Sequence, residues 1–226
     1  MIHDMSYAIQ GALRQENHLE IQANHMANSA TTGFKSQVLS FDEMFQAHMT
    51  LDTRQGDLVA TESPLDLAIS GDGFFKIQTD HGNRYTRNGN FSLNAEGTLV
   101  TSEGDPVLGE NGPITIDGNV ITISDTGEIN VDETVVGTLK IVSFDAPEQL
   151  TKEGNSLLIH GGPEKDEIIP ADSKIRQRHL EQSNVEIVRE MTSMVTTNRS
   201  YESFQKLMQT IDELNAKAVT EVGKIG

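Results

Sequence analysis

The chain has 226 residues, of which 34 are acidic and 17 are basic, so its formal net charge is −17. This charge argues against nucleic acid and against an anionic membrane surface as partners, although a need for solubility alone would also account for it. The absence of Cys excludes disulfide frameworks and thiolate metal sites.

Residues 1–33 show the pattern of a long amphipathic helix. Positions separated alternately by three and four residues are apolar or Ala, with one acidic exception. They are Ile2, Met5, Ile9, Ala12, Glu16, Leu19, Ala23, Met26 and Ala30. We expect a helix over residues 1–31 that Gly33 ends with a left-handed backbone. Residues 34–64 contain few strand formers, and we interpret them as a partly extended connector.

Residues 65–170 are predicted to form a β domain, mostly antiparallel. The apolar period changes to two at Leu65, Leu67 and Ile69. Turn pairs such as Glu96-Gly97 and Thr126-Gly127 then separate short runs of strand formers. Turns at intervals of about 8–12 residues are typical of a β-sandwich or a barrel-like domain.

Residues 171–226 return to the helical period. One stripe consists of Ile187, Met191, Met194 and Tyr201, and a second of Phe204, Leu207, Ile211, Leu214 and Ala218. The shift between the stripes, near Tyr201, predicts a local change of supercoiling. We therefore predict an α+β fold in which the N- and C-terminal helices pair as a coiled coil and the β domain is inserted between them.

The sequence shows no pattern typical of a catalytic, cofactor or metal site. Its seven His residues lack metal-ligand spacing, and Gly71 and Gly73 lack the third Gly of a dinucleotide fingerprint. We therefore expect no enzymatic activity and no cofactor. A peptidoglycan hydrolase would need a motif that is missing. A secreted carbohydrate-binding β module would need exposed aromatic residues, whereas the chain has no Trp and three Tyr.

Neither a membrane span nor an ordinary signal peptide is expected. No apolar run approaches the ~18 residues that a membrane helix needs. The N-terminal residues lack the basic and apolar regions of a signal peptide. From these features alone, the expected location is the cytoplasm.

Three stretches carry a resemblance to a known family. The first, at residues 19–35, reads LEIQANHMANSATTGFK. The second reads SPLDLAISGDGFF at residues 63–75 and RYTRNGNF at residues 84–91. The third reads LEQSNVEIVREM at residues 180–191 and NRSYE at residues 198–202. In order and spacing, over nearly the whole chain, they resemble the rod and hook family of the flagellar basal body, the axial proteins of the bacterial flagellum.

The resemblance implies a structural subunit that polymerises into a helical tube, transmits torque and encloses the export channel. Its implied partners are copies of itself, neighbouring rod proteins and the flagellar type III export apparatus. Members of the family are exported unfolded without a cleaved signal, so the implied location is the periplasmic part of the basal body instead of the cytoplasm. The terminal helices would line the channel, and the β domain would face outward.

Positions that match the family are expected to make contacts between subunits. Asn24 and Asn28 share a helical face and could bond to a partner helix. Ser183 and Asn184 are expected to cap the C-terminal helix, and Lys35 to suit the dipole of the first helix. The alternative is that these residues cap or pair within one subunit. The complete set of predicted assembly residues is Ile2, Met5, Ile9, Leu19, Asn24, Met26, Asn28, Thr32, Gly33, Phe34, Lys35, Leu180, Ser183, Asn184, Val185, Met191, Met194, Arg199, Tyr201, Glu202, Phe204, Leu207, Ile211 and Leu214.

Within the family, the chain is more similar to the proximal-rod type than to the distal-rod type. The connector between Gly33 and Gly71 is short, whereas distal-rod proteins usually carry a longer segment there. Residues 136–142 and 148–154 also resemble the proximal type. Residues 198–202 resemble the distal type as much, so the distal rod is the alternative.

Overall fold

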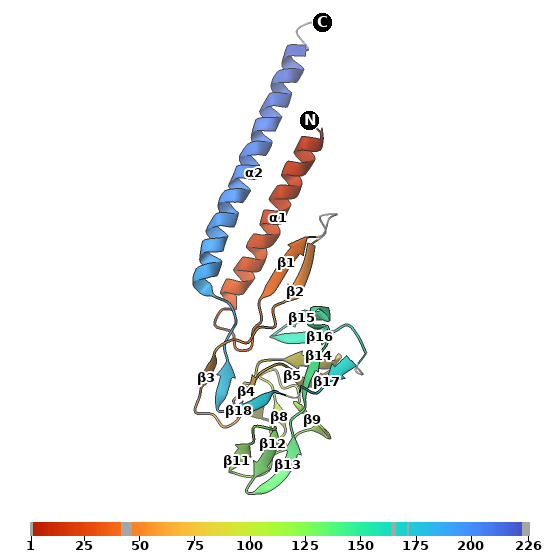
Figure 1. Ribbon diagram of the computed structural model, residues 1–226, viewed down its shortest axis with the longest axis vertical. Helices are drawn as coiled ribbons and strands as arrows, with labels where there is room; N and C mark the ends of the chain where they lie inside the picture. Colours follow the sequence, from red (N-terminus) through yellow and green to blue (C-terminus); the bar gives the residue numbers. More distant parts are fainter. Residues whose placement is uncertain (1, 42–46, 164–165, 171, 223–226) are drawn as a thin grey trace. The chain divides into compact units, whose positions relative to one another are not determined.

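The computed structural model describes residues 2–41, 47–163, 166–170 and 172–222. It divides into a helical unit, Met1–Ala27 with Glu186–Gly226, and a β unit, Asn28–Val185. Figure 1 shows one helix at each end of the chain and antiparallel strands between them, which is compatible with the α+β class. The predicted division at residues 33, 64 and 170 stays a prediction. Residues 1, 42–46, 164–165, 171 and 223–226 of that division lie outside the described part.

The helical unit consists of α1 (Ile2–Ala27) and α2 (Ile187–Val222). The helices lie side by side and antiparallel, because Gln22 contacts Ser193 whereas His25, a turn further along α1, contacts Glu190, a turn earlier on α2. Over the residues described, neither helix has the length and apolar content that crossing a bilayer requires.

Both helices are shorter than the sequence pattern predicted. α1 ends at Ala27, and a turn follows in which the Thr31 N–H donates to the Asn28 carbonyl at 3.1 Å and the Thr31 hydroxyl to Asn28 Oδ1 at 3.2 Å. α2 begins at Ile187 because Lys174–Gln177 and His179–Glu181 form strands with distant segments of the β unit.

The predicted coiled coil is wrong. Of its proposed α1 seam, Ile9 is 42% exposed, and Glu16 and Ala23 are exposed as well. The α1 face that is buried instead includes the polar side chains of Gln22 and His25. An apolar heptad seam therefore does not join the helices, because hydrogen-bonded polar residues occupy the positions that such a seam would fill.

The register shift predicted near Tyr201 is not found over the described part of α2. Met194, Tyr201, Phe204 and Ile211 are all partly buried, at the three- and four-residue spacing of a single helix face. Members of both predicted stripes are exposed instead: Ile187, Met191, Leu207 and Leu214.

The β unit contains a six-stranded antiparallel sheet in the order β15-β16-β6-β5-β14-β17. Its strands are β5 (Phe74–Thr79), β6 (Gly82–Thr86), β14 (Ile141–Phe144), β15 (Leu150–Gly154), β16 (Leu157–His160) and β17 (Glu167–Ile168). The short helix η1 (Pro147–Gln149) precedes β15. Phe75 lies opposite Thr86 on one side and Ile141 on the other, so β5 is an interior strand of the sheet.

Smaller antiparallel sheets complete the β unit. The two-stranded sheets are β1 (Gln37–Phe41) with β2 (Ala47–Leu51), β3 (Leu58–Ala60) with β19 (His179–Glu181), β4 (Leu67–Ser70) with β18 (Lys174–Gln177), β7 (Ser92–Leu93) with β8 (Leu99–Val100), and β9 (Leu108–Gly109) with β10 (Gly112–Pro113). A three-stranded sheet consists of β11 (Ile121–Ile123), β12 (Glu128–Val131) and β13 (Thr134–Thr138). The pairs β3–β19 and β4–β18 bring the first and last thirds of the β unit together.

Two apolar clusters stabilise the β unit. The larger is built around Leu67, Ile69, Phe75, Ile77 and Leu99, which are fully buried. Alternation along β4 and β5 places the first four inward, and Leu99 joins them from β8. Each buried Leu, Ile or Phe contributes about 1.5–3 kcal/mol relative to exposure. The smaller cluster surrounds the rings of Phe74, Tyr85 and Phe144.

Candidate functional site

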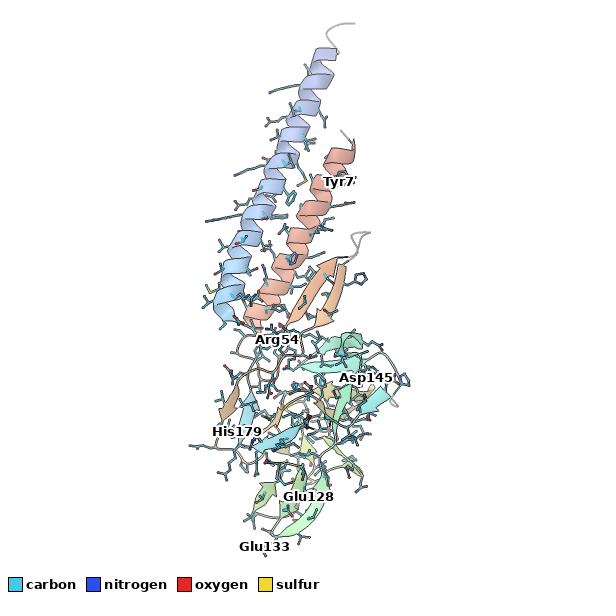
Figure 2. The ribbon with its side chains drawn as sticks, in the orientation of Figure 1. Tyr7, Arg54, Glu128, Glu133, Asp145 and His179 are labelled. Atoms are coloured by element: carbon cyan, nitrogen blue, oxygen red, sulfur yellow. The ribbon has the colours of Figure 1, made fainter. Side chains whose placement is uncertain are left out.

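Four segments of the β unit meet in a buried polar cluster: residues 33–36, 52–57, 86–88 and 181–184. We call this cluster the junction. Two of its segments continue in sequence toward the helices, one following α1 and the other preceding α2. Arg54, labelled in Figure 2, marks its position in the β unit.

Glu181 is the centre of the junction. This residue is 0% exposed, and its Oε1 accepts from Lys35 Nζ at 2.6 Å and from the Gly56 N–H at 3.0 Å. Its Oε2 accepts from Arg87 Nη1 at 3.0 Å. One carboxylate therefore joins three segments that are far apart in sequence, with charge-assisted bonds of the stronger kind.

The two cations are also held by main-chain carbonyls. Lys35 Nζ donates to the carbonyl of Arg54 at 2.6 Å, and Arg87 Nη2 donates to that of Gly71 at 2.7 Å. Burial lowers the pKa of Lys35 and of Arg87, and the carboxylate of Glu181 opposes both shifts. The junction therefore depends on Glu181, because without it two buried positive charges would face each other.

Asn184 extends the junction by linking the segment before α2 to the segment after α1. Its Oδ1 accepts from the Ser36 N–H at 2.7 Å. Its Nδ2 donates to the carbonyls of Asp52 at 2.9 Å and of Arg54 at 3.2 Å. Both the oxygen and the nitrogen of the Asn184 amide therefore bond to the segment after α1. The role predicted for Asn184 as an N-cap of α2 is wrong, because its side-chain oxygen accepts from Ser36 instead.

Close backbone approach explains the glycines of the junction. Gly33 has φ +67°, and a Cβ there would lie 2.2 Å from the Asn88 nitrogen. The Gly33 N–H donates to the Glu181 carbonyl at 2.8 Å. The expected left-handed backbone of Gly33 is confirmed, but the residue lies beyond the end of α1 and does not cap it. Its small size lets residues 33 and 88 touch.

Phe34 is fixed by a cation on its ring. Lys152 Nζ lies 3.5 Å from the ring centroid of Phe34, and Phe34 is 6% exposed. Lys152 Nζ is buried without a hydrogen-bond partner. Burial lowers the pKa of Lys152 to about 8. The aromatic ring therefore replaces only part of the hydration that this ammonium loses.

The structure brings part of the predicted assembly set together in or beside the junction. Gly33, Phe34 and Lys35 are buried there, and the Asn184 N–H donates to the Phe34 carbonyl at 3.4 Å. The other predicted residues of these two segments lie close to the junction in sequence. They are Asn28 in the turn after α1, Thr32, whose carbonyl accepts from Ser156, Leu180 in β19, Ser183, whose hydroxyl accepts from the Val185 N–H, and Val185 itself.

The remaining predicted assembly residues lie on the helices and do not form one cluster. Partly buried positions are Met5, Leu19, Met26, Met194, Tyr201, Phe204 and Ile211. Exposed positions are Ile9, Asn24, Met191, Arg199, Glu202, Leu207 and Leu214. Ile2 is the first residue of α1, and its side chain lies outside the described part.

The sequence analysis missed four residues that the structure places at buried contacts. Arg87 and Glu181 form the junction, while Gln22 and His25 lie between the helices. All four occur within the stretches that carry the family resemblance, which is the signal that could have marked them. Hydropathy alone classes them as surface residues, because a buried charge or amide is compensated by partners distant in sequence.

Two family models match the chain. Residues 68–131 match the model described as the flagellar hook protein FlgE/F/G D1 domain. Residues 176–221 match the model described as the flagellar basal body rod FlgEFG protein C-terminal. The first match lies within the β unit, and the second covers β19 and most of α2.

Curated relatives are similar over almost their full length. A flagellar basal-body rod protein FlgF of Caulobacter vibrioides is 37% identical, over 96% of this chain and 95% of the relative. The FlgF protein of Salmonella typhimurium is 34% identical over 96% and 97% of the two chains. The flagellar basal-body rod protein FlgG of Agrobacterium fabrum is 31% identical over 93% and 95%.

Proposed function

The chain belongs to the flagellar basal-body rod protein family and is a FlgF-like structural subunit, and we propose that it forms part of the proximal rod. In this proposal, copies of the chain and neighbouring rod proteins assemble into a helical tube around the export channel. The distal rod is the alternative, supported by the similarity to FlgG. The family is structural, and the proposal assigns no catalytic step to this chain.

The observation that carries the proposal is the junction. Torque that reaches the β unit through the chain must pass through the segments that follow α1 and precede α2. Glu181, Lys35, Arg87 and Asn184 tie both segments to the strands with buried bonds. A cluster of buried ionic and amide contacts has few alternative arrangements, so it holds these two segments rigidly. A solvent-exposed polar linker in their place would bend under torque.

The helices supply apolar surface for neighbours. Tyr7 and Leu13 on α1 are 65% and 53% exposed, and Val188 and Val195 on α2 are 79% and 54% exposed. Such stripes suit burial against other subunits. A carbohydrate-binding module is disfavoured because Tyr85, the tyrosine of the β unit, is 3% exposed and therefore offers no stacking platform.

The route to the basal body is also part of the proposal. We expect the chain to pass unfolded through the flagellar type III export apparatus, without a cleaved signal, and to assemble in the periplasm. The lack of Cys supports this route, because thiols could cross-link an unfolded chain during passage.

Incorporation into basal bodies tests the proposal. In a flagellated strain that lacks the gene for this protein, the unsubstituted chain should restore motility and copurify with basal bodies. Val195→Asp places a charge on the exposed α2 face and should abolish both. Val59→Asp makes the same change on β3, where Val59 is 46% exposed, and should be tolerated. Absence of the unsubstituted chain from purified basal bodies, or normal incorporation of Val195→Asp, would contradict the proposal.

A further inference from the structure

The contact between α1 and α2 is unusually polar for a helix pair. Gln22, His25 and Thr197 are 7%, 4% and 8% exposed, so they are buried between the helices. Large apolar residues such as Tyr7, Leu13 and Val188 are exposed instead. Burial of apolar area alone would have favoured the opposite arrangement.

Each buried polar group has a specific partner on the other helix. Gln22 Nε2 donates to Ser193 Oγ at 2.7 Å and to Thr197 Oγ1 at 3.3 Å. His25 Nδ1 lies 3.0 Å from Glu190 Oε1, which makes Nδ1 the donor to this carboxylate. The three contacts follow one antiparallel register.

Other hydroxyls of α2 behave differently. Several exposed Ser and Thr residues donate to the carbonyl four residues earlier in their own helix, the usual partner of a helical hydroxyl. They are Thr192, Thr196, Ser200, Ser203 and Thr210. Ser193 and Thr197 lie opposite Gln22, and their hydroxyl oxygens accept hydrogen bonds from its amide on α1. They therefore connect the two helices.

The apolar part of the contact combines small buried side chains with larger, partly buried ones such as Leu19, Met194 and Tyr201. Ala8 and Ala12 are the buried apolar residues among the described side chains of α1, and the ring of Phe204 lies over Gly11, where a Cβ would be 2.5 Å from the ring. Small side chains can slide past one another with little change in packing. A slip by one turn would separate the Gln22 amide from Ser193 and Thr197, and His25 Nδ1 from Glu190, and losing these buried hydrogen bonds is unfavourable.

We propose that Gln22 and His25, with Ser193, Thr197 and Glu190, are positioning residues that fix the register of α1 against α2. In doing so, they determine which apolar side chains of each helix stay exposed for neighbours. The inference concerns the helix register within one chain. It can be wrong while the proposed rod function is right, and it can be right while the rod function is wrong.

The polar contacts specify register at some expense of stability. Gln22 Oε1 is buried without a hydrogen-bond partner. Replacing a partly satisfied buried polar set with apolar residues is often neutral or stabilising, although it can remove structural specificity. A residue that only stabilised the pair would show the opposite effect, a loss of stability with the register unchanged.

The experiment measures register and stability in the same chain. Because the chain has no Cys, Asn17→Cys and Gln205→Cys introduce two unique sites for nitroxide labels, both at exposed positions. Labelled chains are diluted with unlabelled chain so that pulsed electron resonance reports distances within one molecule. The unsubstituted helices should give one narrow distance.

Gln22→Leu combined with His25→Leu should add a second distance, displaced by up to about 5 Å for a slip of one turn or up to about 10 Å for seven residues. The thermal unfolding midpoint should not fall. Gln10→Leu, the same change at an exposed position of α1, should leave the single distance unchanged.

Should the double variant lose helix content by circular dichroism, Ser193→Ala with Thr197→Val decides the question, since it removes the partners from α2. The second distance is expected there too. A single unchanged distance in the folded variants would overturn the proposal. A broad distribution in the unsubstituted chain would overturn it as well, because the polar contacts would then not fix the register.

Discussion

The β unit and the helical unit differ in how completely they bury large apolar side chains. In the β unit, Leu67, Ile69 and Phe75 are 0% exposed and pack in one cluster. In the helical unit, Val188 and Leu214 are 79% and 59% exposed. The β unit therefore has its own closed apolar core, although it also exposes side chains such as Val59, whereas in the helical unit many large apolar side chains lie at the surface.

The two units also bury different kinds of polar group. The β unit buries charges: Lys35, Arg87 and Glu181 form bonds that join distant segments. The helical unit buries the neutral amide of Gln22 and the ring of His25. The junction of the β unit thus relies on charge-assisted bonds of the stronger kind. The contact between the helices relies on directional bonds from an amide and an imidazole.

The largest effect is expected from removing the charge at the junction. Glu181→Gln keeps the shape of the side chain but leaves Lys35 and Arg87 uncompensated, and should lower the free energy of unfolding by about 3–5 kcal/mol. Urea denaturation of the full chain measures this loss. Glu96→Gln, at an exposed turn position, should change stability by less than about 0.5 kcal/mol. Equal effects of the two substitutions would show that Glu181 does not hold the junction together.

A matched pair of leucines sharpens the comparison between the units. Leu67→Ala removes a fully buried side chain and should cost about 2–5 kcal/mol. Leu214→Ala makes the same change where the side chain is 59% exposed, and should stay within about 0.5 kcal/mol. The same denaturation measurement applies to dilute, unassembled chain. A large loss at Leu214 would mean that the helical unit closes its own core.

Part of the fold could be predicted because local periodicity specifies it. The three- and four-residue spacing predicts a helix at each end, and turn pairs predict the β hairpins. Gly97 and Gly127, for instance, have φ +75° and +91°, as turn glycines require. Residues 174–181 were misjudged because their strands pair with residues 58–70, and no local pattern contains that pairing.

The functional contacts were harder to predict for the same reason. The motifs drew attention to Gly33, Lys35 and Asn184, but not to the Glu181 carboxylate that Lys35 contacts 146 positions away. The coiled-coil prediction failed at Gln22 and His25, because the predicted seam was drawn from apolar positions and did not include them. Their burial depends on hydroxyl and carboxylate partners on α2, which only the folded pair brings near.

The smallest expected effect concerns Lys152, whose ammonium lies over the ring of Phe34. Burial lowers its pKa from 10.5 to about 8. Between these values, the unfolded chain binds one proton more than the folded chain, so the contribution of Lys152 to folding stability rises with pH. Below pH 8, both states carry the proton, and the folded chain bears the full penalty of the buried charge.

Lys152→Met removes this titration and keeps a flexible side chain against the aromatic ring. The stability of the variant relative to the unsubstituted chain should therefore be greatest near pH 7 and decline steadily toward pH 10.5. Urea denaturation at several pH values measures that difference. Lys174→Met makes the same substitution at an exposed position of β18 and is the control, which should change stability by less than about 0.5 kcal/mol. If the stability difference between Lys152→Met and the unsubstituted chain did not change with pH, the Lys152 ammonium would have to stay hydrated in the folded chain. Its contact with Phe34 would then lie at the surface of the β unit instead of inside it.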